Sequence, residues 1–125
     1  MQIYQTKWFA HWAIKEGLTN QTIIDAVIEM EKGLVDAHLG GNVVKKRVGI
    51  GGRGKSGGVR TILAFKVKHN AFFLYGFAKN QKDNINEKEL QALKKMAAHF
   101  LDYDKKAIEK AIKSNELIEV NYEKT

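Results

Sequence analysis

The middle of the chain alternates with a period of two, which is the period of a β-strand and not of a helix. From Val59 to Lys68, apolar residues and threonine alternate with positions that include three basic residues: Arg60, Lys66 and Lys68. This pattern predicts a strand with one apolar face and one basic face. Val43 to Val48 is also rich in β-branched residues, and Phe72 to Lys79 (FFLYGFAK) is apolar on both faces, which is typical of a central strand.

Helical periodicity flanks these strands on both sides. Thr6 and Thr19 are the expected N-caps of two helices before the strands, and Asn86 with Glu89 has capping-box spacing after them. We therefore predict an α+β fold with two N-terminal helices, an antiparallel sheet of three to four strands and one long C-terminal helix. Trp8 and Trp12 fall at helical spacing beside Phe9, so we expect them in the core rather than as a base-stacking platform.

The length and composition of the chain limit the classes of protein to which it can belong. The 125 residues predict a single domain over 1–125, with 104–125 as a possible C-terminal extension. The chain has no cysteine, which excludes disulfides and thiolate metal sites. No run of 18 apolar residues occurs, and the N-terminal MQIYQTKWF does not read as a signal peptide. We therefore expect a cytoplasmic protein without a membrane partner.

Positive charge is concentrated in the middle third of the chain. The net charge is +7, yet no acidic residue occurs between Asp36 and Asp83. The same interval holds ten basic residues: Lys45, Lys46, Arg47, Arg53, Lys55, Arg60, Lys66, Lys68, Lys79 and Lys82. A segment of one sign attracts polyanions, so the sequence favours a nucleic-acid partner.

Gly49 to Ser56, GIGGRGKS, spells the P-loop pattern G-x-x-x-x-G-K-S. A P-loop needs a helix directly after it and an acidic residue to help hold magnesium. Here Gly-Gly-Val-Arg-Thr-Ile-Leu follows, which favours a strand, and no carboxylate is near in the sequence. We expect no nucleotide-triphosphate site. Glycines that allow close approach, with Arg53, Lys55 and Arg60 between them, suit a phosphate of a longer polyanion instead.

Several short motifs in order resemble one family. They are the basic strand VVKKRV, GRGKSGGVRTI, FFLYGFAKN and a helix with L-x-x-L-K-K, and together they extend from about Trp8 to Leu101. The chain resembles the RelE/HigB-like toxins of bacterial type II toxin–antitoxin modules, within the RelE/ParE superfamily. The resemblance implies a small endoribonuclease that cleaves mRNA, commonly on the translating ribosome, and that a cognate antitoxin protein neutralises. Because the RNA 2′-hydroxyl is the nucleophile, no metal and no cofactor are expected.

The resemblance also assigns catalytic roles. Arg60 matches the family's strand arginine and is the expected clamp on the scissile phosphate. Lys55 matches the loop lysine and is the candidate base, because neighbouring positive charge lowers the pKa of a lysine. Lys79 stands where some relatives carry an arginine, and it would hold phosphate or act as an acid. The set of expected RNA-binding residues is Lys45, Lys46, Arg47, Arg53, Lys66 and Tyr75.

Some assignments stay open on the sequence alone. Tyr75 would either stack on a base or pack in the core. Several relatives use a tyrosine near the C-terminus, and either Tyr103 or Tyr122 would take that place. Some toxins of this fold act on DNA gyrase without a basic catalytic set, so a gyrase-directed toxin is one alternative. A basic nucleic-acid-binding protein without enzymatic activity is the other.

Overall fold

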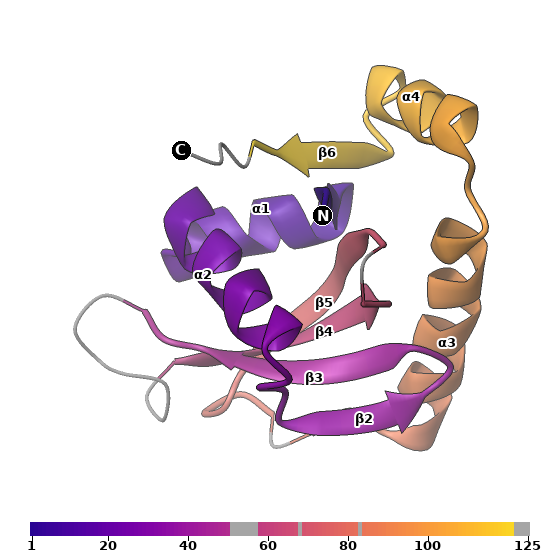
Figure 1. Ribbon diagram of the computed structural model, residues 1–125. Coiled ribbons are helices and arrows are strands. Elements are labelled where there is room, and N and C mark those ends of the chain that lie inside the picture. Colours follow the sequence, from indigo (N-terminus) through magenta and orange to yellow (C-terminus); the bar gives the residue numbers. More distant parts are fainter. Residues whose placement is uncertain (51–57, 68, 83, 122–125) are drawn as a thin grey trace.

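The computed structural model describes residues 1–50, 58–67, 69–82 and 84–121. Within these ranges the chain forms six strands and four helices (Figure 1). In chain order they are β1 (Ile3–Thr6), α1 (Lys7–Glu16), α2 (Asn20–Glu31), β2 (Ala37–Gly40), β3 (Val43–Val48), β4 (Val59–Phe65), β5 (Ala71–Ala78), α3 (Glu87–Leu101), α4 (Lys105–Lys113) and β6 (Leu117–Val120).

The strands form one mixed sheet in the order β2-β3-β4-β5-β1-β6. Strand β1 runs parallel to β5, and all other neighbouring pairs are antiparallel. The predicted three- to four-stranded antiparallel sheet with a single long C-terminal helix is therefore wrong. Strands β1 and β2 have only four residues each, which is too short for a recognisable alternation. After α3, Asp104 caps the separate helix α4 by accepting a hydrogen bond from the Ala107 N–H at 2.8 Å.

The predicted helix starts are confirmed, and each has a local cause. The Thr6 hydroxyl accepts a hydrogen bond from the Phe9 N–H at 3.1 Å, which caps α1 directly at the end of β1. Thr19 caps α2 in a reciprocal capping box. Asn86 accepts from the Glu89 N–H at 2.8 Å while the Glu89 carboxylate accepts from the Asn86 N–H at 2.9 Å. These caps satisfy N–H groups that have no partner inside the helix.

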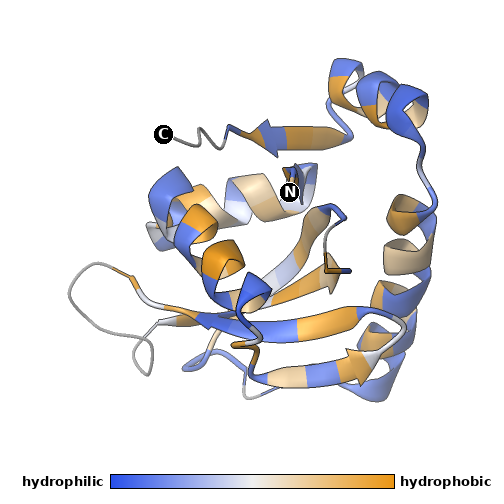
Figure 2. Ribbon diagram, viewed as in Figure 1, coloured by the Kyte–Doolittle hydropathy of each residue, from blue (hydrophilic) through white to orange (hydrophobic). Residues whose placement is uncertain are grey.

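Helices cover the sheet on both faces. Helices α1 and α2 pack on one face in a cluster that includes Phe9, Val27, Leu63 and Phe73, and α3 and α4 pack on the other face (Figure 1). Strand β4 is buried at all seven positions, so the predicted exposed basic face of this strand is wrong. The alternation instead separates two buried surfaces. Figure 2 shows hydrophilic residues at the end of β3 that leads toward β4. None of the helices in the described ranges is long and apolar enough to span a membrane.

A tryptophan ring from α1 lies against the backbone of β5. A Cβ atom on Gly76 would lie 2.1 Å from the Trp12 ring, so this strand position accepts only glycine without displacing the ring. Trp12 is half-buried and contacts the α1–α2 core cluster, as expected for it. Trp8 is 50% exposed, and the expectation that it belongs to the core is wrong.

We predict that Gly76→Ala lowers the free energy of unfolding by about 1–3 kcal/mol, because overpacking moves Trp12 off the strand. Urea denaturation of a double-mutant cycle with Trp12→Ala measures the effect. Alanine at position 76 should cost much less once the ring is gone. Equal costs of Gly76→Ala in the two backgrounds would contradict the contact.

Candidate functional site

Two arginines lie directly opposite each other at one end of the sheet. In the register of β3 and β4, Arg47 pairs with Arg60, and on the other side Arg60 pairs with Phe77 of β5. Residues paired in this way project from the same face of a sheet. Arg60 is only 6% exposed, and its Nη1 atom is buried without a hydrogen-bond partner.

This arrangement is unfavourable for the protein alone. Like charges directly opposite on neighbouring strands repel, and a buried polar atom without a partner loses its hydration with nothing in return. An anion bound between Arg47 and Arg60 would remove both costs. An arginine fork also matches phosphate oxygens in pairs, which a lysine cannot do.

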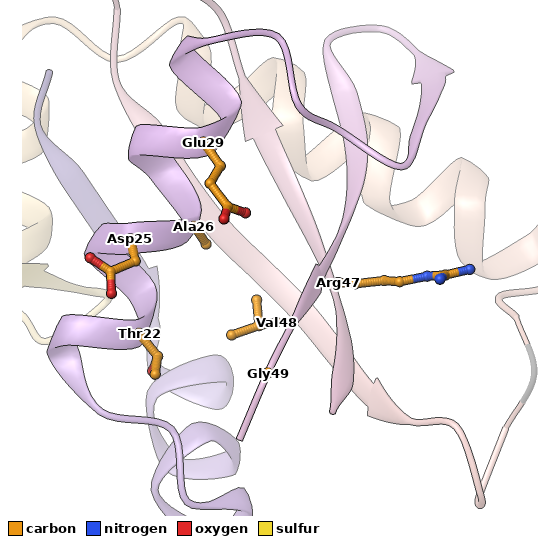
Figure 3. Close-up of a pocket in the computed structure, with 7 residues that line it drawn as sticks. All are labelled: Thr22, Asp25, Ala26, Glu29, Arg47, Val48 and Gly49. Atoms are coloured by element: carbon orange, nitrogen blue, oxygen red, sulfur yellow. The ribbon is translucent and has the colours of Figure 1, made fainter. Parts of the chain in front are cut away.

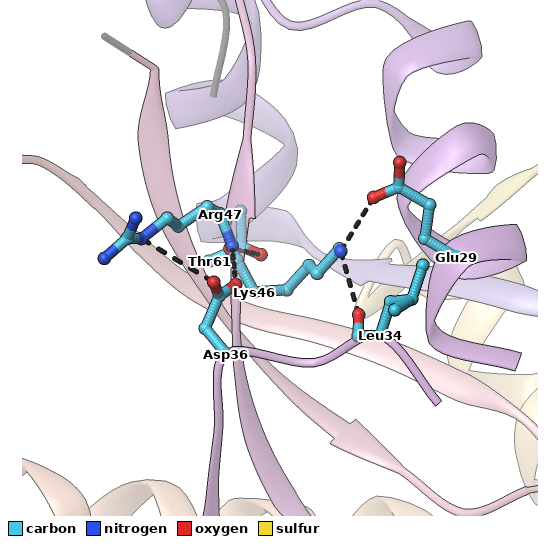
Figure 4. A network of polar contacts seen from close by, with 6 residues as sticks. All are labelled: Glu29, Leu34, Asp36, Lys46, Arg47 and Thr61. Carbon is cyan, nitrogen blue, oxygen red and sulfur yellow. Dashed lines mark hydrogen bonds and ion pairs between the residues drawn. The ribbon is translucent and has the colours of Figure 1, made fainter. Parts of the chain in front are cut away.

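Asp36, which lies just before β2, holds Arg47 in place. Its backbone N–H donates to Asp36 Oδ2 at 2.6 Å, and its Nε atom lies 3.6 Å from Asp36 Oδ1 (Figure 4). The Arg47 side chain is still 50% exposed, so its charge stays accessible. Figure 3 shows the side chain pointing away from α2, while Val48 next to it points toward α2. A 220 Å³ pocket is lined by Thr22, Asp25, Ala26 and Glu29 of α2 and by Arg47, Val48 and Gly49, so Arg47 borders it although its guanidinium points away from α2.

Lys46 has a structural partner on the opposite face from Arg47. Its ammonium donates to the Leu34 carbonyl at 2.8 Å and lies 2.7 Å from Glu29 Oε1 (Figure 4). The side chain is 5% exposed. On β4, Thr61 pairs with Lys46 and donates its hydroxyl to the Lys46 carbonyl at 2.9 Å. This lysine joins β3 to α2, and its charge does not face Arg60.

The other predicted site residues divide by their place in the sheet. Half-buried Lys45 lies two residues before Arg47, on the same face of β3, and pairs with Ile62. Exposed Lys79 directly follows β5, at the end where Ala78 pairs with Val59. Lys66 follows the last residue of β4. It is six residues from Arg60, which corresponds to about 20 Å at the rise per residue of a β-strand. Lys66 is therefore not part of the cluster at Arg60.

Arg53 and Lys55 lie outside the described residues. Residues 51–57 belong to the connection between β3 and β4, whose paired ends are Val48 and Val59. At its end, a Cβ atom on Gly58 would lie 2.0 Å from the Val48 carbonyl oxygen, so only glycine fits there. The segment that follows the P-loop spelling is strand β4, antiparallel to β3, and not the helix that a P-loop requires.

Tyr75 is half-buried on the same face as Arg60. Strand β5 has one extra residue, Leu74, after which Tyr75 pairs with Ile62, two residues beyond Arg60 on β4. The Lys82 ammonium lies 5.9 Å from the Tyr75 ring centroid and forms an ion pair with Glu89. Sequence reasoning missed Lys82 and Glu89 as neighbours of the site, because a turn of uncertain length separates them from the strand.

The Lys82–Glu89 pair is a fixed pair of charges. The Asn86 backbone N–H and then the Lys82 ammonium hold the pKa of the Glu89 carboxyl below its usual range. The hydrogen bond to Glu89 raises the pKa of Lys82. Lys82 therefore stays protonated near neutral pH and is not suited to act as a general base.

Tyr103 lies at the other end of the sheet from Arg60. Its ring contacts Phe100, which stacks on Phe72, and Phe72 pairs with Ala64, four residues along β4 from Arg60. The Tyr103 hydroxyl donates to Glu116 at 2.6 Å, and this bond raises its pKa to about 12. Tyr122 lies outside the described residues. No group of three or more metal-binding side chains occurs in the part of the chain that the structure describes.

We expect replacement of buried Lys46 and replacement of buried Arg60 to have opposite effects on the free energy of unfolding. Lys46→Met removes bonds to Glu29 and the Leu34 carbonyl, and should lower the free energy of unfolding by about 1–3 kcal/mol. Arg60→Met removes a buried charge whose Nη1 has no partner, and should leave stability equal to or above that of the parent. Urea denaturation of the matched pair measures both. A loss of more than about 2 kcal/mol in Arg60→Met would contradict the absence of a partner for Arg60 Nη1.

A comparison with protein families gives one match over nearly the whole chain. Residues 1–120 match the family described as the RelE toxin of the RelE/RelB toxin–antitoxin system. No curated protein matches the chain. The match does not confirm the narrower HigB-like subtype that the motifs suggested. Membership implies an antitoxin as the protein partner. The matched range includes every strand and helix of the described structure, and the chain belongs to the RelE family of toxins.

Proposed function

We propose that this toxin is a metal-independent endoribonuclease that cleaves mRNA on or near the ribosome, in the cytoplasm, and so inhibits translation. The observation that carries the proposal is the pair Arg60 and Arg47. Arg60 is buried with a free Nη1, and an accessible Arg47 lies directly opposite. A phosphate diester of RNA is the anion that this pair would hold.

The proposed reaction uses the RNA 2′-hydroxyl as the nucleophile. A base removes its proton, the oxygen attacks the adjacent phosphorus, and the P–O5′ bond breaks. The products are a 2′,3′-cyclic phosphate and a 5′-hydroxyl, which takes up one proton. Arg60 and Arg47 would stabilise the extra negative charge of the phosphorane, in a site where burial of Arg60 strengthens its field.

The remaining roles follow from position and side-chain chemistry. Lys55, in the connection that joins the Arg47 and Arg60 strands, is the proposed base, with Arg53 as a further phosphate contact. Lys79, at the same end of β5, would hold phosphate or protonate the leaving oxygen. Lys45 and Tyr75 extend the RNA-binding surface on that face. Lys46 and Lys66 are not included, since Lys46 pairs with Glu29 and Lys66 lies at the far end of β4.

We predict that Arg60→Ala abolishes growth arrest while the protein stays folded, with single-turnover mRNA cleavage slowed by roughly 100- to 1,000-fold. Arg60→Lys should recover only part of the rate, because lysine cannot pair two phosphate oxygens. Lys113→Ala, on exposed α4 surface, is the control and should cleave like the parent. Mapping of mRNA ends after induction, with circular dichroism for folding, gives the readout.

Two results would overturn the proposal. One is a folded Arg60→Ala protein that cleaves mRNA at the parental rate. The other is intact mRNA in growth-arrested cells with an accumulation of cleaved DNA–gyrase complexes, which would favour a gyrase-directed toxin of the same family.

A further inference from the structure

We propose that Trp8 is a stacking platform for a nucleobase of the RNA strand next to the phosphate at Arg60. This inference rests on the proposed RNA function and adds a base-binding residue to it. Trp8 carries no charge and lies on α1, outside the basic segment, so neither the charge pattern nor the family motifs point to it.

Trp8 is an exposed aromatic ring, whereas Trp12, Tyr75 and Tyr103 are half-buried. Among the described residues, the exposed large hydrophobic side chains are Trp8, Ile14, Leu34, Val67 and Met96. Trp8 is the one aromatic ring in this set, and half of its surface meets solvent. A base of any identity has a π-face that stacks on an accessible aromatic ring.

The ring is held firmly although it is exposed. Its centroid lies 4.9 Å from that of Tyr75, with an interplanar angle of 26°, and 6.0 Å from that of Trp12, with an angle of 11°. Trp12 in turn rests on Gly76, where no side chain intervenes. Trp8 follows the Thr6 cap of α1 by two residues, so its backbone is fixed as well. A platform held in this way loses little entropy on binding.

The aromatic and basic residues near Trp8 favour RNA as the ligand of this ring. Tyr75, which contacts Trp8, lies diagonally across the sheet from Arg60, a relation that spans roughly 7–8 Å. The Lys82 ammonium, in its ion pair with Glu89, lies 5.9 Å from the Tyr75 ring centroid. Stacked aromatic rings beside cations are the usual means of binding single-stranded nucleic acid. A purely apolar protein partner would instead require the desolvation of these charges.

Ile14 provides the matched control on the same helix. It is 76% exposed, more than Trp8, but it has no ring that could stack on a base. Loss of exposed apolar surface alone would therefore affect Ile14→Ala and Trp8→Ala alike. A stacking role affects only Trp8→Ala.

The experiment compares two probes that carry the same phosphate charge. One is a mixed-sequence 12-nucleotide RNA with 2′-O-methyl groups, which block the nucleophile, and the other is an all-abasic oligomer of equal length. We expect the parent chain to bind the RNA more tightly than the abasic oligomer. Trp8→Ala should weaken RNA binding by roughly five- to 150-fold and leave abasic binding unchanged. Trp8→Tyr should retain most of the parental affinity, and Ile14→Ala all of it.

Comparison of Arg60→Ala with Trp8→Ala tests the role of Trp8 separately from the proposed RNA function. Arg60→Ala should weaken binding of both oligomers, because it acts on phosphate. If Arg60→Ala does so but Trp8→Ala binds RNA like the parent, the platform is wrong and the RNA function stands. A Trp8→Ala protein that loses antitoxin binding but not RNA binding would show that Trp8 contacts protein. If the parent binds neither oligomer, the platform is overturned, and the mapping of mRNA ends alone decides the proposed function.

Discussion

The buried guanidinium of Arg60 is the constraint on which the rest of the site depends. Its Nη1 has no partner, and Arg47 adds a second positive charge directly across the strand pair. A fold keeps such a group only if its surroundings hold it in place. Strand β4 does so, because it is buried along its length between helices on both faces and bonded to β3 and β5. The charge is therefore preorganised before any anion arrives.

The contrast between Lys46 and Arg60 shows why burial alone does not mark a site. Both side chains are nearly inaccessible, and they belong to paired strands. Lys46 projects toward α2, where Glu29 and the Leu34 carbonyl satisfy it. Arg60 projects to the other face, where Arg47 is its register partner and its Nη1 has no hydrogen-bond partner. Because successive residues alternate in facing, the run Lys45, Lys46 and Arg47 supplies a structural ion pair to one face and charge for a ligand to the other.

Local signals in the sequence predicted local structure well. Thr6, Thr19 and Asn86 are caps as their spacing indicates, because capping depends only on residues within one turn. The strand cores around VVKKRV and FFLYGFAK also agree. Strand β1 and strand β2 were missed, since four residues carry no period, and β1 is placed only by pairing with the distant β5 and β6. Which strands join the sheet depends on pairing between segments that are distant in the sequence.

The positions of the candidate site residues in the fold depend on long-range contacts in the same way. Arg60 and Arg47 could be associated from their motifs, but the alternating pattern suggested that Arg60 was exposed. The sequence pattern does not show that α3, a distant segment, covers that face of the sheet. Lys66 was grouped with Arg60 by alternation, although β4 ends at Phe65. The exposure of Trp8 was missed. Gly76, in the middle of an apolar strand, was a signal that an aromatic ring approaches the backbone there, and that ring is Trp12.

A structure of the chain with the 2′-O-methyl RNA bound tests the central claim most directly. We expect a phosphate oxygen at hydrogen-bond distance from Arg60 Nη1, about 2.7–3.2 Å, with the Arg47 guanidinium turned toward the same phosphate. Nη1 paired with a carboxylate or carbonyl of the chain itself, and the RNA bound elsewhere, would contradict it.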